Sequence, residues 1–253
     1  MSAFALLGQN SVLAAFLIFC RVAACLMVVP GFSSTRIPAQ IRLFVAFAVS
    51  LAIAPVVLPG FQSRLSDQVP AVTLAWIVVE SLTGFVIGLL GRIFLFVLES
   101  IVTAMATAAG FGVIPGTPLE GEPVPGFGAL LMLAATALMF AADLHWELVR
   151  GIVDSYDRIP PGTGLGVQAS LVQVTDQIGA VFVMGLRIGS PFIAYSIVVN
   201  LALGFANKLT PQVPVFFIAT PFLMAGGLLL LYATSTEFMT QFLTAYASWL
   251  RRG

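Results

Sequence analysis

The chain has 253 residues with a formal net charge of zero; 59% of the residues are hydrophobic and 9% are charged. Soluble domains carry roughly 25% charged residues, so this composition excludes an ordinary soluble domain and predicts an integral membrane protein. The zero net charge provides no field that would gather nucleic acid. Because one helical span takes about 20 residues, the chain has room for a single polytopic domain over residues 1–253.

Six apolar runs, bounded by polar residues or by Pro and Gly, are candidates for membrane-spanning helices. In chain order they cover residues 12–30, 43–59, 71–98, 127–142, 178–206 and 213–234. The second and fourth runs are short for a full crossing and the third is long. We therefore expect some helices to be kinked, tilted or shielded by neighbouring protein.

Four charged residues lie inside these runs: Arg21, Glu80, Arg92 and Arg187. A charge at bilayer depth costs at least ~2.5 kcal/mol, so it normally faces protein or a water-filled path. We interpret the four as buried charges that serve assembly or line a conduit. Arg21 and Glu80 could pair across helices, but the sequence does not show whether they do.

Two features of the runs indicate packing rather than chemistry. Gly84 and Gly88 form a small-xxx-small face on the third run, which permits a close approach between helices. Cys20 and Cys25 lie on different faces of the first run, which suits neither a disulfide nor a metal site. We interpret both cysteines as small packing residues.

The connection between the third and fourth runs, residues 108–128, is dense in Gly and Pro and contains Glu120 and Glu122. Such a stretch cannot be helical throughout. Its first part, residues 110–114, is apolar and contains two glycines. Irregular backbone at membrane depth is tolerated only where it is buried in protein or lines a cavity. Two interpretations stay open: an ordinary solvent-exposed turn and a pore-lining segment.

Two connections, residues 36–42 and 208–214, each place a base, a Pro and a Gln at the tip of a helical hairpin. Their similarity suggests two hairpin units. With six alternating spans both tips fall on one side of the membrane, which the positive-inside rule makes cytoplasmic. Arg251 and Arg252 would fall on the opposite side, which weakens this topology.

After residue 234 the pattern becomes amphipathic, with aromatic residues at helical spacing: Phe238, Phe242, Tyr246 and Trp249. This pattern predicts an amphipathic C-terminal helix with interfacial anchors. Lying on a membrane and packing on a partner are both open.

Enzymatic function finds no positive support in the sequence. His145, the only histidine, lies between Asp143 and Glu147, and we interpret it as a hydrogen-bonded structural group rather than a catalytic or metal-binding one. The motifs of zinc peptidases, serine hydrolases and nucleotide-binding proteins are absent, and we expect no cofactor.

Taken in order, several groups of residues resemble the FliR family, the inner-membrane export-gate proteins of the flagellar type III secretion system. They are Phe19–Arg21, Pro30–Phe32, Arg36–Arg42, Leu144–His145, Ser155–Tyr156, Ile159–Gly162, Asn200–Gly204 and Pro211–Gln212. The resemblance covers about residues 12–232. Injectisome counterparts share the architecture and are the alternative.

The resemblance implies an all-α chain in which about residues 1–170 are FliP-like. About residues 171–253 would then be a FliQ-like hairpin followed by the amphipathic helix. It implies assembly with FliP-like and FliQ-like subunits in the flagellar basal body. A FlhB-like subunit would bind the cytoplasmic hairpin tip at Lys208, Pro211 and Gln212. Unfolded flagellar subunits would pass through the channel.

Members of this family present a glycine-rich loop that obstructs the closed channel. The matching residues are Gly110, Phe111, Gly112, Val113 and Ile114. The resemblance implies that Phe111, Val113 and Ile114 form the seal. The part of the loop from Leu119 to Pro125 departs from the family pattern, so the length and shape of this loop do not follow from the resemblance.

Two other classes of function remain as alternatives. A self-contained secondary transporter would use Arg21, Glu80, Arg92 and Arg187 to line a substrate path. A passive scaffold would keep Phe111 away from any passing substrate.

Overall fold

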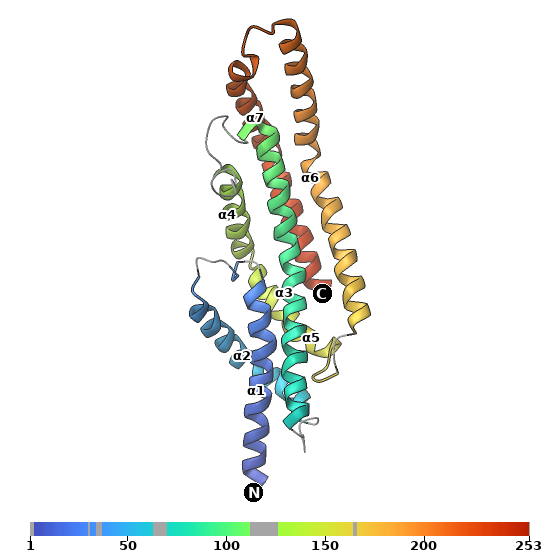
Figure 1. Cartoon of the computed structure of the whole chain (residues 1–253). Helices are drawn as coiled ribbons and strands as arrows, with labels where there is room; N and C mark the ends of the chain where they lie inside the picture. The colour runs from blue at the N-terminus through green and yellow to red at the C-terminus, as the bar shows by residue number, and fades with distance from the viewer. Residues whose placement is uncertain are drawn as a thin grey trace. The chain divides into compact units, whose positions relative to one another are not determined.

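The computed structural model describes residues 3–29, 31–33, 37–62, 70–111, 126–163 and 166–252. Within these ranges the chain is helical and contains no β-strand (Figure 1). The elements are α1 (Ala3–Val28), α2 (Ala39–Gln62), α3 (Pro70–Ala106), the π-type turn η1 (Thr107–Phe111), α4 (Gly126–Ala141), α5 (Leu144–Arg158), α6 (Val167–Leu209) and α7 (Val215–Arg252).

In the part of the chain that the structure describes, five helical segments are long and apolar enough to cross a membrane: Asn10–Val28, Ala39–Phe61, Pro70–Gly110, Val172–Leu209 and Phe217–Arg251. Met132–Ala141 and Leu144–Arg158 add a sixth if they are taken together as one broken span. The predicted class is therefore confirmed: this is an all-α membrane protein with about six hydrophobic helices. The fourth predicted run was short because its span breaks around Asp143, which has a left-handed backbone with φ of 57°.

The chain forms two compact units that alternate along the sequence. The first unit draws on residues 1–94, 143–178 and 247–253, and the second draws on residues 95–142 and 179–246. This division follows contacts within the chain. The boundary expected near residue 170 separates two parts that resemble different families. Contacts within this chain do not bear on such a resemblance, so this boundary stays a prediction.

In the first unit, α1 and α2 form a hairpin whose arms pack on each other (Figure 1). The helix α2 begins directly after Pro38, whose carbonyl accepts hydrogen bonds from the amides of Ile41 and Arg42. Proline suits the start of a helix because its fixed φ is already helical and its missing N–H has no partner there. Apolar side chains on both arms make the core; among the buried ones are Leu17, Ile18, Val22, Ile53, Val57 and Phe61.

The backbones of α1 and α3 touch where the sequence predicts a small-residue face. A Cβ atom added to Gly84 would lie 2.0 Å from the carbonyl oxygen of Arg21, and one added to Gly88 would lie 2.7 Å from that of Cys25. No larger residue fits at either position without moving a helix. The predicted close approach is confirmed, and it brings Arg21 next to α3.

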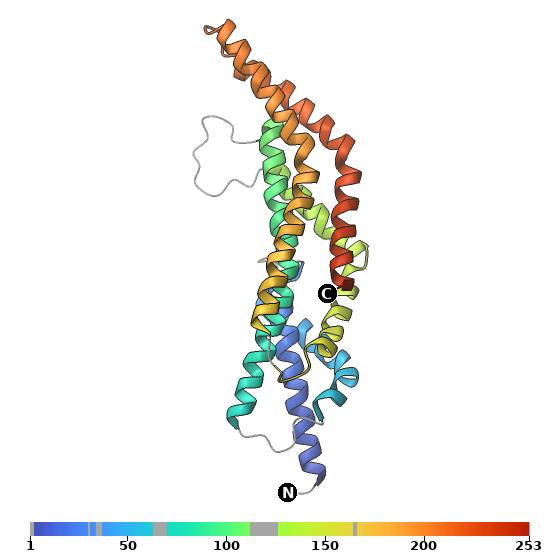
Figure 2. The ribbon, with the colours of Figure 1, turned by 90° about the vertical axis from the view of Figure 1, so that its right-hand side faces the viewer.

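In the second unit, α6 and α7 form a long hairpin (Figures 1 and 2). Tyr195 of α6 donates a 2.8 Å hydrogen bond from its hydroxyl to the carbonyl of Leu223 in α7. Gly226 faces this tyrosine at close range, and Gly185 of α6 faces Ile101 of α3. Small residues thus allow these helices to pack closely.

The amphipathic segment after residue 234 is a continuation of α7 rather than a separate helix. Phe238, Phe242 and Tyr246 are buried within the chain itself. In the last turns, the ring of Trp249 lies 5.5 Å from that of Phe94, measured between centroids. The aromatic face that could have covered a membrane or a partner is therefore largely covered by this chain.

Candidate functional site

Arg21 and Glu80 form an ion pair in the core of the first unit. Arg21 Nε lies 2.7 Å from Glu80 Oε2, and both side chains have 0% exposure. The pair joins α1 to α3 at the place where Gly84 brings the two backbones together. It accounts for two of the four charges that the sequence places inside apolar runs.

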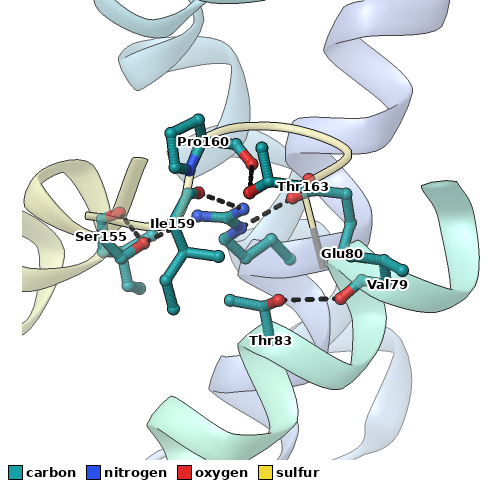
Figure 3. Close-up of polar contacts among 9 residues, drawn as sticks. Val79, Glu80, Thr83, Ser155, Ile159, Pro160 and Thr163 are labelled. Carbon is teal, nitrogen blue, oxygen red and sulfur yellow. Dashed lines mark hydrogen bonds and ion pairs between the residues drawn. The ribbon is translucent and has the colours of Figure 1, made fainter. Parts of the chain in front are cut away.

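The other nitrogens of the Arg21 guanidinium bind the end of α5 (Figure 3). Nη1 donates to Ser155 Oγ at 3.0 Å, and Nη2 donates to the carbonyl of Ile159 at 3.1 Å. Ser155 Oγ in turn donates its own proton to the carbonyl of Ile152 at 2.6 Å, which leaves its lone pairs free to accept. The ring of Tyr156 lies against the guanidinium, with Cζ 3.8 Å from the ring centroid, a cation–π contact.

The carbonyl of Ile159 is available because α5 stops there. Ile159 has a non-helical backbone, and its amide bonds to the carbonyl of Ser155. The loop after it is held in place by Thr163, whose amide and hydroxyl both donate to the carbonyl of Pro160. Gly162 has a φ of 75° and lies so close to Trp76 that a Cβ atom would be 2.3 Å from the indole ring. The loop is thereby fixed against α3.

Aromatic rings cover the cluster on one side. Phe61 of α2 is fully buried; its ring centroid lies 5.9 Å from that of Tyr156 and 6.4 Å from that of Trp76. Two buried atoms, Glu80 Oε1 and the hydroxyl oxygen of Tyr156, find no hydrogen-bond partner in the part of the chain that the structure describes. The surroundings of the ion pair are thus mostly apolar.

We call this group of residues the Arg21 cluster: Arg21, Phe61, Trp76, Glu80, Ser155, Tyr156, Ile159 and Gly162. It connects α1, α2, α3 and the end of α5. Its two charges have no exposed surface, and their contacts run to other elements of this chain. Among the described residues no group of three His, Cys, Asp or Glu side chains could hold a metal ion, and Cys20 and Cys25 are free.

The predicted seal begins at the end of α3, in the second unit. Gly110 has φ of 82° and ψ of 8°, the left-handed conformation that ends a helix and that glycine adopts without strain. The turn η1 lies against α7, since a Cβ atom on Gly227 would be 2.4 Å from Cβ of Ala109. The chain therefore leaves α3 from a fixed point. Gly112, Val113, Ile114 and the side chain of Phe111 lie outside the described residues, so the seal stays a prediction.

The remaining predicted site residues are on the surface of this chain. Arg92 and Arg187 are exposed, unlike Arg21 and Glu80. Lys208, Pro211 and Gln212 at the tip of the α6–α7 hairpin are also exposed. The tip is accessible to a partner, whereas any burial of Arg92 and Arg187 would need atoms from outside the described residues.

Sequence reasoning from charge and periodicity did not find Ser155, Tyr156, Ile159 or Gly162 as functional residues. They entered only through the family resemblance. The one physical signal was indirect: an arginine inside an apolar run needs acceptors for all its N–H groups. Nothing in the local sequence shows that these acceptors come from the end of α5.

The fold defines the class: a multi-pass helical membrane protein with a buried ion pair in its first unit. The chain belongs to the family "Bacterial export proteins, family 1", whose model matches residues 12–248. It is 33% identical over 239 residues to the "Flagellar biosynthetic protein FliR" of Caulobacter vibrioides, covering 91% of each chain. It is 26% identical over 224 residues to the protein of the same name from Escherichia coli, covering 84% of this chain and 80% of the relative. The protein of that name from Aquifex aeolicus is 26% identical over 234 residues, covering 88% of this chain and 86% of the relative.

Proposed function

We propose that this chain is a subunit of the flagellar type III export gate, which passes unfolded flagellar subunits across the bacterial inner membrane. FliP-like and FliQ-like subunits would complete the channel, and a FlhB-like subunit would bind the exposed tip at Lys208, Pro211 and Gln212. The gate would be part of the flagellar basal body. The relatives named above are flagellar proteins, which favours this role over the injectisome counterpart.

The observation that carries the gate mechanism is the glycine-terminated end of α3. Gly110 turns the chain out of a helix whose last turn is anchored on α7 through Ala109 and Gly227. A loop that starts at such an anchor can place apolar side chains repeatedly at the same spot. An apolar constriction blocks ions because it denies them their hydration shell. Phe111, Val113 and Ile114 would supply that constriction and move aside for a polypeptide.

The rival transporter function is less well supported by the geometry. It requires Arg21 and Glu80 to line a path for a solute, yet both side chains are fully buried. All three guanidinium nitrogens of Arg21 are already bound to protein atoms. Their arrangement suits a permanent structural contact.

The test removes the seal and keeps the assembly. Phe111→Ala combined with Ile114→Gly is expected to make membranes that contain the assembled complex leak ions, measured as conductance in planar bilayers or as ion flux into vesicles. The matched control is Phe44→Ala, which removes the same ring from a side chain that is 73% exposed on α2. An assembled double variant with unchanged conductance would argue against the seal.

Assembly itself is measured by purifying the tagged chain gently from native membranes and identifying what accompanies it by mass spectrometry. Recovery of two other small helical membrane proteins supports the gate. Recovery of the chain alone, as a monomer or homodimer that binds a small solute, would favour the transporter and overturn the proposal.

A further inference from the structure

The side of α6 that points away from the rest of the second unit has an arginine in the middle of an apolar surface. The opposite side is buried: Val181, Gly185, Ile188, Gly189 and Phe192. Arg187 lies on the exposed side, about 160° around the helix from Gly185 at 100° per residue. Its helical neighbours on this side are exposed as well: Ala180, Val183, Ser190, Ala194 and Val198.

Arg187 has no acceptor for its guanidinium among the described residues. The polar group next to it on this face is satisfied within α6, because Ser190 donates its hydroxyl proton to the carbonyl of Arg187 at 2.8 Å. The guanidinium is therefore the one group on this face whose need for an acceptor the described part of the chain leaves unmet.

Neither lipid nor water satisfies this face. Lipid tails would suit the apolar side chains and leave a charge in hydrocarbon, which is costly. Water would suit the charge and leave exposed valines on both sides of it, with Val183 57% and Val198 66% exposed. A lipid headgroup region would satisfy the arginine and leave the apolar side chains on one side of it in water. A protein surface that is apolar and carries one acceptor satisfies both.

We propose that Arg187 docks a helix of another gate subunit, one that presents an Asp or Glu side chain opposite the guanidinium. A carboxylate is the acceptor because it neutralises the charge and can accept two N–H groups at once. Ala180 and Ala194 lie seven residues to either side of Arg187, about 10.5 Å along the axis. Small side chains at these positions let a second helix approach closely enough for the pair to form. This inference rests on the proposed function, which supplies the other subunits.

The first test compares how much of the other gate subunits is recovered with tagged variants. Arg187→Met and Arg187→Glu are expected to reduce recovery about tenfold or more, the scale expected when a desolvated charge pair loses one partner. Arg187→Lys keeps the charge and is expected to retain most of the recovery. The matched control is Arg150→Met on α5, where the side chain is 75% exposed and has a 3.7 Å contact to Glu147; it is expected to stay within about twofold of wild type.

Stability separates docking from folding. Because Arg187 is exposed, all three of its variants are expected to unfold at the wild-type temperature in detergent. If Arg187→Met recovers as much of the other subunits as wild type does, the inference is overturned and the proposed function is untouched. If the wild-type chain recovers none, the proposed function itself fails.

The second test identifies the occupant by photo-crosslinking from a benzophenone amino acid at position 194, with position 193, off this face, as the control. Crosslinks from position 194 to a peptide of another subunit that contains Asp or Glu support the inference. Crosslinks to lipid alone, or to residues 112–125 of this chain, which include Glu120 and Glu122, overturn it.

Discussion

Arg21 and Glu80 are 59 positions apart in the chain, and their 2.7 Å ion pair is shielded completely from the surroundings. Each charge depends on the other, because a buried charge that loses its partner is left uncompensated. The pair is also continuous with the end of α5 through Ser155 and Ile159. The first unit is therefore held by one arginine that binds two helices and a loop.

Removal of one partner of this pair is expected to be strongly destabilising. Arg21→Met and Glu80→Gln should each cost about 3–5 kcal/mol of folding free energy. The double variant Arg21→Met with Glu80→Gln leaves neither charge of the pair and should be more stable than the additive sum of the single changes. Thermal unfolding in detergent, followed by fluorescence-detected size exclusion, measures all of them. Arg92→Met, at an exposed position, is the control; strictly additive single changes would contradict the coupling.

The contact between α1 and α3 should reject even one methyl group. Gly84→Ala places a Cβ atom 2.0 Å from the carbonyl oxygen of Arg21, so the helices must separate, at a cost of about 1–3 kcal/mol or more. Gly204→Ala in α6 meets nothing within 4 Å and should be neutral or stabilising by up to about 1 kcal/mol, because alanine favours helix. The unfolding temperature should fall clearly for Gly84→Ala. For Gly204→Ala it should stay at the wild-type value or rise.

The backbone at Gly110 sets how the loop leaves α3. A Cβ atom there would lie 3.4 Å from Cβ of Leu223, which is tight but not prohibitive, so the cost of substitution comes from the positive φ. Gly110→Ala should cost about 1–2 kcal/mol or change the conformation, while Gly110→Asn should be milder because asparagine visits this region more readily. Swimming motility should decrease in the order Gly, Asn, Ala at position 110. Membrane conductance should increase in the same order. Equal behaviour of Asn and Ala would show that this conformation is not required.

Tyr156 should contribute through its ring and not through its hydroxyl. The ring lies 3.8 Å from the Arg21 guanidinium carbon, whereas the buried hydroxyl has no partner among the described residues. Tyr156→Phe is expected to be neutral or stabilising, and Tyr156→Leu should cost about 2 kcal/mol through the lost cation–π contact. A Tyr156→Phe variant that is as unstable as Tyr156→Leu would point to a hydrogen-bonded hydroxyl.

The sequence was sufficient for the class of protein and for most of its helices. Long apolar runs exist because each span must satisfy its own backbone hydrogen bonds in lipid, and that requirement is visible in composition alone. The break at Asp143 was not visible, because the apolar run simply ends near the point where the helix changes direction. The continuity of α7 past residue 234 was missed for the opposite reason: a change of pattern marks a change of surroundings and not a break in the helix.

The candidate site was harder to predict because pairing is a property of the fold. Arg21 and Arg187 look alike in the sequence, each a single arginine in an apolar run, yet one is fully buried and the other is exposed. What separates them is the presence of acceptors brought from distant segments, such as Glu80 and the carbonyl of Ile159. No local pattern contains that information.

The missing side chain at Gly84 has a further consequence for how this protein can change over evolutionary time. The ion pair of Arg21 and Glu80 forms only while α1 and α3 remain in backbone contact, so a larger residue at position 84 removes most of what the pair contributes. Once that has happened, the loss of Glu80 or of Ser155 adds little further harm. The residues tolerated at positions 21, 80, 84 and 155 therefore form one joint set, and the effect of exchanging any one of them depends on which residues occupy the other three.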